Sequence, residues 1–412
     1  MTLDAFSQHC AHPYFSARDG ELLIAGRRVT QLASAAGRTP FYCYDRSVMS
    51  RKVAEFRAAM PDGVELHYAI KANPLLEIVQ HFAGCVDGLD VASARELEVA
   101  LSTDVVVTDV SFAGPGKTVA ELERAVAAGI VINAESELEI RRISEIAERE
   151  GTRPKVAIRV NPDFELKSSG MKMAGGPKQF GIDAERVPDV LAAMSDSPVE
   201  FWGFHIFSGS QNLRAESLIE SEQKSASLAF DLARHAPGPV RMLNLGGGFG
   251  IPYFPGEHPL DVTPIGAALG ELVPRIRQHL PDAKIVIELG RYLVGESGVY
   301  VCRVIDRKIS RGHVFLVTDG GLHHHLAASG NFGQVLRKNY PVLIANRVGS
   351  TQREVASVVG PLCTPLDLLA DRMDLAVAQV GDLVAVFQSG AYGLSASPLG
   401  FLSHPAPLEF VL

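Results

Sequence analysis

The feature that most constrains the fold is a regular alternation of short β-branched runs with amphipathic helical segments between residues 64 and 289. This alternation is typical of a parallel sheet, because a parallel connection needs a crossover that a helix supplies. Eight such units match an α/β fold of the (β/α)8 TIM-barrel type in length and number, with a doubly wound sheet as the alternative. The predicted strands are Glu65–Ile70, Gly88–Ala92, Val105–Asp109, Ile130–Ala134, Lys155–Val160, Phe201–Phe207, Arg241–Leu245 and Lys284–Leu289.

After Leu289 the rhythm changes to strand-like runs with few helices between them. These runs are Gly298–Ile305, Val314–Thr318, Glu354–Val358, Leu383–Phe387 and Leu408–Leu412. They predict a C-terminal antiparallel β domain, to which the segment Tyr14–Gln31 adds strands. The predicted domains are therefore a barrel over residues 40–289 and a β domain built from 1–39 and 290–412.

Composition excludes several classes of protein. With 412 residues, 47% hydrophobic and 21% charged, the chain has enough material for two globular domains. Its net charge of -8 offers no basic surface, so we expect no nucleic-acid partner. We also expect no membrane association, because no apolar run has spanning length and the first residues do not resemble a signal peptide. Five scattered cysteines predict reduced thiols and a cytoplasmic location.

Polar residues recur where the predicted barrel strands end, and a barrel enzyme builds its active site at that mouth. They are Lys71, Asp90, Arg159, His205, Ser208, Ser210, the run Gly246–Gly250 and the segment Glu288–Arg291. Taken singly, each is an ordinary loop or capping residue, and a lysine at a strand end is most often solvated. Their coincidence at one mouth favours a functional site.

Two of these features indicate particular chemistry. A lysine that closes an apolar strand, as Lys71 does, is costly to desolvate unless it is paired or neutral. A neutral amine suits Schiff-base formation with a carbonyl or with pyridoxal phosphate (PLP). The glycines of Gly246–Gly250 allow backbone N–H groups to approach a phosphate, although a purely structural turn remains open. Their spacing does not fit the dinucleotide fingerprint GxGxxG.

Several segments occur in the order seen in the PLP-dependent decarboxylases of the alanine-racemase fold. That family includes diaminopimelate decarboxylase and eukaryotic ornithine decarboxylase. The segments are His67–Pro74, Gly203–Gln211, Gly246–Gly250, Glu288–Arg291, Gly360–Asp367 and Gly390–Gly393. The chain resembles the family from about Phe41 to its C-terminus. The resemblance implies a PLP-binding barrel, a C-terminal β domain and a homodimer that shares its active sites across the interface.

The resemblance also implies roles by position. Lys71 resembles the lysine that binds the cofactor covalently, and Cys363 resembles the acid that reprotonates Cα from the partner subunit. Arg159 is similar to the arginine near the phenolic oxygen of PLP. Glu288 resembles the carboxylate on the pyridine nitrogen, which favours decarboxylation because a pyridinium is the necessary electron sink. The other implied cofactor contacts are Asp90, Phe207, Ser210, Gly246, Gly247, Gly248, Gly290, Arg291 and Tyr392.

The chain departs from the family pattern at positions that bear on the substrate. Phe207 replaces a histidine that stacks on the pyridine, so a ring face remains but a proton role does not. Thr364 replaces an acid that holds the distal ammonium of the substrate in relatives, and without it a buried ammonium would lack a partner. The segment Asp319–Gln334 replaces the Arg-Pro-x-x-Tyr of diaminopimelate decarboxylases. The implied substrate contacts are Arg291, His323, Asn331, Thr364, Asp367 and Tyr392.

Three consecutive histidines at positions 323–325 invite a metal site. On a strand, neighbouring side chains point to opposite faces, so all three cannot bind one ion, and we predict no metal site. Substrate contact, a subunit interface and structural filling remain open for this run.

A second layer of resemblance concerns His323–Gln334, Met171–Gly181 and Cys363–Asp367. These stretches look like decarboxylases that act on glutamyl groups tethered to an acyl carrier protein, and like PLP decarboxylases of exopolysaccharide and exosortase gene clusters. We therefore expect a decarboxylase for an L-amino acid or aminoacyl group without a free distal ammonium. Diaminopimelate decarboxylase is the alternative. A non-catalytic regulatory relative would be expected to have lost Lys71 or Cys363, and both are present.

Overall fold

The computed structural model describes residues 8–164, 171–172, 175–334 and 336–412. The chain forms two compact units. The barrel unit comprises Val53–Gly250 and Leu260–Gly290, and the β unit comprises Met1–Lys52, Ile251–Pro259 and Arg291–Leu412. The residues that the signal-peptide expectation rests on, and most of the loop 165–174, lie outside the described residues.

The barrel unit contains a closed parallel barrel, as predicted. Its strands follow the order β5-β6-β7-β8-β9-β12-β14-β15, and β15 pairs with β5 to close it. The bounds are β5 Val64–Ala69, β6 Gly88–Val91, β7 Val110–Phe112, β8 Val131–Ala134, β9 Lys155–Asn161, β12 Glu200–Ile206, β14 Met242–Gly247 and β15 Lys284–Leu289. The short strand β11 (Ile182–Asp183) extends the sheet beside β9, outside the closed ring.

One predicted strand is wrong. Residues 105–109 form a connection that ends in a 3-10 turn, Val107–Asp109, and the strand begins only at Val110. Val106 is 62% exposed, whereas Val110 and Phe112 are fully buried between β6 and β8. A run of valines has high β propensity wherever it occurs, and packing decides which valines enter the sheet.

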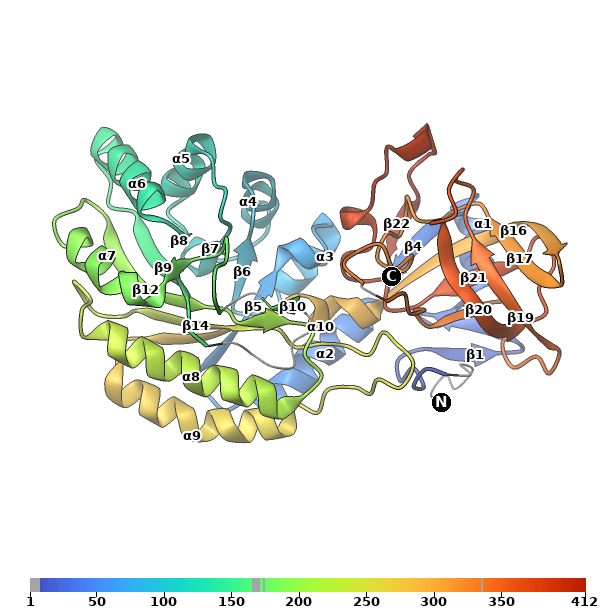
Figure 1. Ribbon diagram of the computed structural model, residues 1–412, viewed down its shortest axis with the longest axis horizontal. Coiled ribbons are helices and arrows are strands. Elements are labelled where there is room, and N and C mark those ends of the chain that lie inside the picture. The colour runs from blue at the N-terminus through green and yellow to red at the C-terminus, as the bar shows by residue number, and fades with distance from the viewer. Residues whose placement is uncertain (1–7, 165–170, 173–174, 335) are drawn as a thin grey trace. The chain divides into compact units, whose positions relative to one another are not determined.

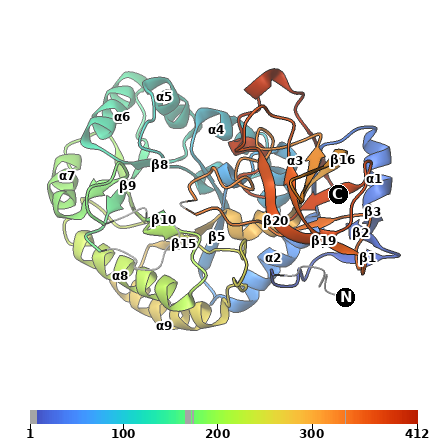
Figure 2. The same cartoon turned by 45° about the vertical axis from the view of Figure 1, so that its right-hand side comes forward.

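Helices surround the barrel strands (Figures 1 and 2), and α8 and α9 lie side by side in both views. Three of them begin at hydroxyl caps: Ser93, Thr118 and Ser136 each accept the backbone N–H three residues further on. The bounds are α3 Leu76–Ala83, α4 Ala94–Leu101, α5 Val119–Ala128, α6 Glu137–Glu150, α7 Val187–Met194, α8 Ala215–Ala233 and α9 Thr263–His279. No helix in the described ranges is both long and apolar enough to span a membrane.

The barrel interior has an apolar layer and a polar layer. Val131, Ala157, Met242 and Val286 pack together with Trp202. Side chains two positions further along a strand point to the same face. Those positions hold Asn133, Arg159, Asn244 and Glu288, so charged and amide groups follow the apolar layer toward the carboxyl ends of the strands.

The β unit contains a mixed sheet. The path is β18-β21-β16-β17-β19-β20, and β4 pairs with β16 and β22. The predicted antiparallel arrangement is therefore corrected at two pairs, β17 with β19 and β22 with β4, which are parallel. Parallel neighbours need long connections, and about thirty residues separate β17 from β19. The bounds are β4 Phe41–Tyr44, β16 Gly298–Ser310, β17 His313–Thr318, β18 Val342–Ile344, β19 Arg353–Val359, β20 Leu368–Ala376, β21 Leu383–Val386 and β22 Leu408–Val411.

The N-terminal strands belong to the β unit without extending its main sheet. β1 (Ser16–Arg18), β2 (Glu21–Ile24) and β3 (Arg27–Arg28) form a sheet of their own, followed by α1 (Val29–Ala36). Leu22 and Ile24 are buried in one cluster with core residues of the main sheet. Strand β4, within the range 40–289 that was predicted as barrel, hydrogen-bonds to β16 and β22 in the β unit. Two further helices are α2 (Arg46–Ala59) and α10 (Arg291–Val294).

Candidate active site

Lys71 lies at the carboxyl end of β5, as predicted. The strand ends at Ala69, and a 3-10 turn over Ile70–Ala72 carries the lysine. Gly290 allows this turn to pack against the end of β15, since a Cβ there would lie 2.8 Å from Cβ of Ala72. The lysine side chain is 39% exposed, with Nζ 3.1 Å from Oε1 of Glu288 and 3.5 Å from Oδ2 of Asp90. The strand-end lysine is therefore partly exposed and lies beside two acidic side chains, rather than being desolvated without a partner.

Glu288 and Asp90 form a coupled acidic pair beside this lysine. Both are buried, and the hydroxyl of Ser111 donates to Asp90 at 2.9 Å. Burial, reinforced by the Glu288 charge, raises the pKa of Asp90 well above its usual range. Burial alone would raise the pKa of Glu288 too, but the adjacent ammonium of Lys71 keeps it below its usual value. The pKa values of the two acids therefore shift in opposite directions, which favours the negative charge on Glu288 and the proton on Asp90.

Two further side chains surround Glu288. Nε2 of His205 lies 3.5 Å from Oε2 of Glu288, and Nδ2 of Asn244 lies 3.4 Å from the same oxygen. Burial lowers the pKa of His205 to about 4, so the imidazole is neutral at pH 7. Asn244 was not predicted from the sequence. The only signal for it is its position two residues before Gly246, on the inward face of β14.

Several buried polar atoms at this mouth have no hydrogen-bond partner within the described ranges. They are Nδ2 and Oδ1 of Asn133, Nδ1 of His205, and the hydroxyls of Ser208 and Ser210. Buried polar groups in folded proteins are almost always hydrogen-bonded to protein or to something bound. This concentration of open donors and acceptors fits a polar, hydrogen-bonding ligand such as PLP.

The glycine run forms a close backbone cradle. A Cβ on Gly248 would lie 2.1 Å from the carbonyl oxygen of Gly209, and one on Gly247 would lie 2.0 Å from that of Glu288. Gly248 also has φ +83°, a backbone conformation that favours glycine. The ring of Phe207 lies against Gly246, with Cδ2 2.7 Å from the position of a Cβ. The cradle and the open hydroxyls of Ser208 and Ser210 therefore suit a phosphate group.

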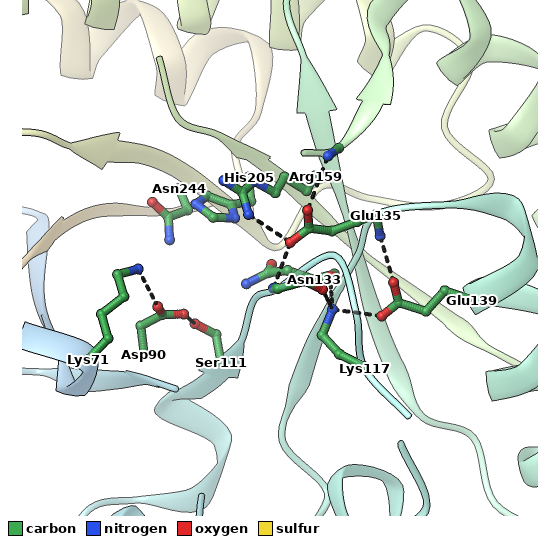
Figure 3. Close-up of polar contacts among 12 residues, drawn as sticks. Lys71, Asp90, Ser111, Lys117, Asn133, Glu135, Glu139, Arg159, His205 and Asn244 are labelled. Atoms are coloured by element: carbon green, nitrogen blue, oxygen red, sulfur yellow. Dashed lines mark hydrogen bonds and ion pairs between the residues drawn. The ribbon is translucent and has the colours of Figure 1, made fainter. Parts of the chain in front are cut away.

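Arg159, expected near the cofactor, is buried on the inward face of β9. Its Nη1 donates to Oε1 of Glu135 at 2.7 Å, and its guanidinium lies over the ring of Phe180. Figure 3 shows Arg159 directed at Glu135 and Lys71 directed at Asp90. Glu135 was not singled out from the sequence, because an acid that follows a strand is an unremarkable helix-start residue.

In the β unit, Arg291 and Tyr392 lie together. Both are implied by the resemblance as contacts of the cofactor and the substrate. The guanidinium of Arg291 lies 4.6 Å from the ring centre of Tyr392, and Nη1 donates to the hydroxyl of Tyr253 at 2.9 Å. The ring of Tyr253 also packs against that of Tyr340, tilted by 40° with ring centres 4.6 Å apart. No carboxylate in the described ranges is ion-paired with Arg291, so the cationic group is available to an anion.

The residues of the Gly360–Asp367 loop have different environments. Cys363 is exposed on the loop between β19 and β20. Thr364 is half-buried, and its hydroxyl accepts the N–H of Leu366. Asp367 is buried, and its carboxylate accepts the N–H groups of Leu322 at 2.6 Å and Leu362 at 2.8 Å. Asp367 therefore braces two loops, with both of its oxygens engaged by backbone.

The histidine run lies in a turn, not on a strand, and all three rings are buried. Nδ1 of His325 accepts the N–H of Ala328, and Nε2 pairs with the hydroxyl of Ser389. His323 packs on His324 with ring centres 3.7 Å apart, and burial lowers its pKa to about 3. The described part of the chain contains no group of three or more acidic, histidine or cysteine side chains that could hold a metal. Asn331 is exposed and donates to Ser329 at 2.8 Å.

The fold and the site together are those of a (β/α)8-barrel enzyme, with a lysine beside two acidic side chains and a closely packed glycine loop at the carboxyl ends of its strands. Comparison with known proteins identifies the family. Residues 46–295 match the family described as pyridoxal-dependent decarboxylase, pyridoxal binding domain. The chain belongs to this family: it is a PLP-dependent decarboxylase, and the residues at the barrel mouth fit that cofactor.

The similar proteins cover nearly the whole chain. The L-glutamyl-[BtrI acyl-carrier protein] decarboxylase of Niallia circulans is 40% identical over 90% of this chain and 88% of its own length. The diaminopimelate decarboxylase of Aquifex aeolicus is 32% identical over 94% of this chain and 89% of its own. The crystal structure of diaminopimelate decarboxylase from M. jannaschii in complex with L-lysine superimposes with a TM-score of 0.88 at 25% identity, and the match covers 97% of this chain and 93% of that one.

Proposed function

We propose that the enzyme decarboxylates an L-aminoacyl group without a free distal ammonium, carried as a thioester on an acyl carrier protein. The observation that supports this most strongly is the environment of the Cys363–Asp367 loop. Thr364 offers only a hydroxyl, and the carboxylate of Asp367 is already engaged by two backbone N–H groups. The loop thus presents no open carboxylate to a substrate ammonium. The similarity to a carrier-protein glutamyl decarboxylase supports the same substrate class.

In this proposal each residue has a defined task. Bound PLP supplies the electron sink for the bond between Cα and the carboxylate. Lys71 holds the cofactor through its amine, and ionised Glu288 holds a proton at the pyridine nitrogen. Gly246–Gly248 and Ser210 bind the phosphate, while Arg159 donates to the phenolic oxygen. Exposed Cys363 supplies the proton that replaces carbon dioxide at Cα.

The remaining cofactor and substrate contacts stay as proposals of the same kind. Asp90 supports Glu288 through its proton, and Phe207 and Gly290 shape the pocket around the ring and the lysine turn. Arg291 and Tyr392 bind an anionic group, which fits the open guanidinium beside two tyrosine rings. His323 and Asn331 shape the loop that faces the substrate without contributing a charge.

We further propose a homodimer with shared active sites and a cytoplasmic location. The exposed position of Cys363 on a β-unit loop supports a cysteine that serves a neighbouring subunit. The five cysteines are free thiols, which supports a reducing compartment.

The test compares substrates on one preparation of PLP-loaded enzyme. Carbon dioxide release is measured with an L-glutamyl thioester of a carrier protein, free L-glutamate, meso-diaminopimelate and L-lysine. We expect kcat/KM for the thioester to exceed that for each free amino acid by at least about a hundredfold. A clear preference for diaminopimelate would instead establish the alternative, a diaminopimelate decarboxylase, and no release from any substrate would refute the proposed substrate class.

A further inference from the structure

Glu135 joins three loops at the barrel mouth. It follows β8 directly, and its Oε1 accepts Nη1 of Arg159 at 2.7 Å and the N–H of Gly114 at 2.6 Å. Oε2 accepts the N–H of Gly181 at 3.1 Å. One carboxylate therefore ties the ends of β7 and β8 and the segment after β9 to a single guanidinium. Figure 3 shows the part of this network between Glu135 and Arg159.

Burial fixes the relative orientation of Arg159 and Glu135. The side chains of Arg159 and Glu135 are 8% and 2% exposed. A buried guanidinium without its carboxylate would retain an uncompensated charge, and a carboxylate with three donors has little freedom to turn. The guanidinium is thus held in one orientation, with part of its charge neutralised.

A second buried carboxylate nearby does not contact Arg159. Glu139 accepts Nζ of Lys117 at 2.6 Å and the backbone N–H of Glu135 at 3.1 Å. Lys117 in turn donates to the carbonyl oxygens of Gly114 and Asn133 at 2.8 Å. The two acids share a cluster, a degree of burial and a helix start, but only Glu135 touches the arginine of the cofactor site.

We propose that Glu135 is a positioning residue that orients Arg159 and sets the electrostatic field at the phenolic oxygen of the cofactor. This inference rests on the proposed placement of Arg159 beside that oxygen. Because Glu135 neutralises much of the Arg159 charge, its removal should leave a stronger positive field there. A stronger positive field favours the anionic oxygen, and so lowers the pH at which the bound cofactor changes its protonation state.

The experiment compares Glu135→Gln with the matched control Glu139→Gln. Each holoprotein is titrated between pH 5 and 10 while the absorbance of bound PLP is followed, and the melting temperature of each apoprotein is recorded. We expect both substitutions to lower the melting temperature. Only Glu135→Gln should lower the apparent pKa of the chromophore, by about 1 unit, and lower kcat by about tenfold, as loss of a residue that orients a site contact does.

A double-mutant cycle shows whether the effect passes through the arginine. In an Arg159→Gln background, Glu135→Gln should no longer shift the chromophore titration. Should Glu135→Gln not fold, Glu135→Asp serves in its place, because it keeps the charge but shortens the reach, and we expect a smaller shift in the same direction.

The outcomes separate the two claims. If wild-type protein binds no PLP at Lys71, the proposed function fails and this inference fails with it. If wild type titrates normally but the Glu135 and Glu139 variants behave alike, or if the shift persists in the Arg159→Gln background, Glu135 is only structural and this inference alone is overturned.

Discussion

Nζ of Lys71 lies 3.1 Å from Oε1 of Glu288, although the two residues are 217 positions apart in the chain. The contact joins the first and last strands of the barrel, β5 and β15, where the ring closes. It places the only amine at this mouth that lies beside both Glu288 and Asp90 within the described residues. Under the proposed function, Lys71 would hold the cofactor, and the protonated pyridine nitrogen would then give Glu288 another cationic partner.

Substitution of Lys71 should abolish both turnover and covalent attachment of the cofactor. Lys71→Ala removes the amine, and we expect carbon dioxide release to fall by at least about a thousandfold. Lys71→Arg is the control, since it keeps a cation between Glu288 and Asp90 but cannot form an imine. Mass spectrometry after borohydride reduction should show PLP attached to wild type and to neither variant. Attachment at another lysine would contradict the assignment.

Replacement of Glu288 should cost far more activity than replacement of its neighbour Asp90. Glu288→Gln cannot hold a proton at the pyridine nitrogen, and we expect kcat to fall by about a hundredfold or more. The raised pKa of Asp90 favours its neutral form, so Asp90→Asn should change the charge of the site little and should lose much less activity. The rate of single-turnover decarboxylation at pH 7 is measured for both variants. An equal loss in the two variants would show that the negative charge is not localised on Glu288.

Cys363 should affect chemistry without affecting stability. The thiol is exposed, so Cys363→Ala should leave the melting temperature unchanged while impairing the protonation of Cα. Product analysis in deuterated water would show either a slowed reaction or side products. Wild-type rate and product purity in the variant would remove the cysteine from the mechanism.

The proposed shared active site can be tested by subunit mixing. Lys71→Ala and Cys363→Ala proteins, denatured together and refolded, should form hybrid dimers with one intact site and give more normal product than either variant alone. Refolding each variant separately is the control. Absence of recovery in a mixture shown by native mass spectrometry to contain hybrids would place both residues in the same subunit's site.

Buried Glu222 on α8 should make the protein less stable as the pH rises. Burial raises the pKa of Glu222 to about 8 from an ordinary 4.5. Between these two pKa values the folded state holds a proton that the unfolded state has released. The free energy of unfolding is therefore unaffected by this group below pH 4.5 and declines between pH 4.5 and 8. Titration of Glu222 should lower the free energy of unfolding by on the order of 5 kcal/mol over this interval.

Glu222→Gln should remove this decline, so that the variant exceeds wild type in urea midpoint at pH 8 and matches it more closely at pH 5. Glu220→Gln, two residues away on the exposed side of α8, is the matched control and should follow wild type. If the urea midpoints of wild type and Glu222→Gln changed with pH in the same way, the Glu222 carboxyl would not be protonated in the folded protein.

Local pattern was sufficient to predict the barrel. Its strands and helices follow from hydrophobic periodicity, and seven of the eight predicted strands overlap observed strands. A short apolar run between two helical segments has few possible structures other than a buried strand. Lys71, Asp90, Arg159 and Glu288 were expected at one mouth because the ends of parallel strands meet there.

Other features could not be inferred from neighbours in the chain. Each of them joins residues from separate segments. Examples are the pairing of β17 with β19, the contact of Glu135 with Arg159, the backbone contacts of Asp367, and the opposite pKa shifts of Asp90 and Glu288. Their energies depend on burial and on distances of a few ångströms, which sequence spacing does not encode. The amino acids thus specified the kind of chemistry, whereas folding decided which of the two acids has its pKa raised and which has it lowered.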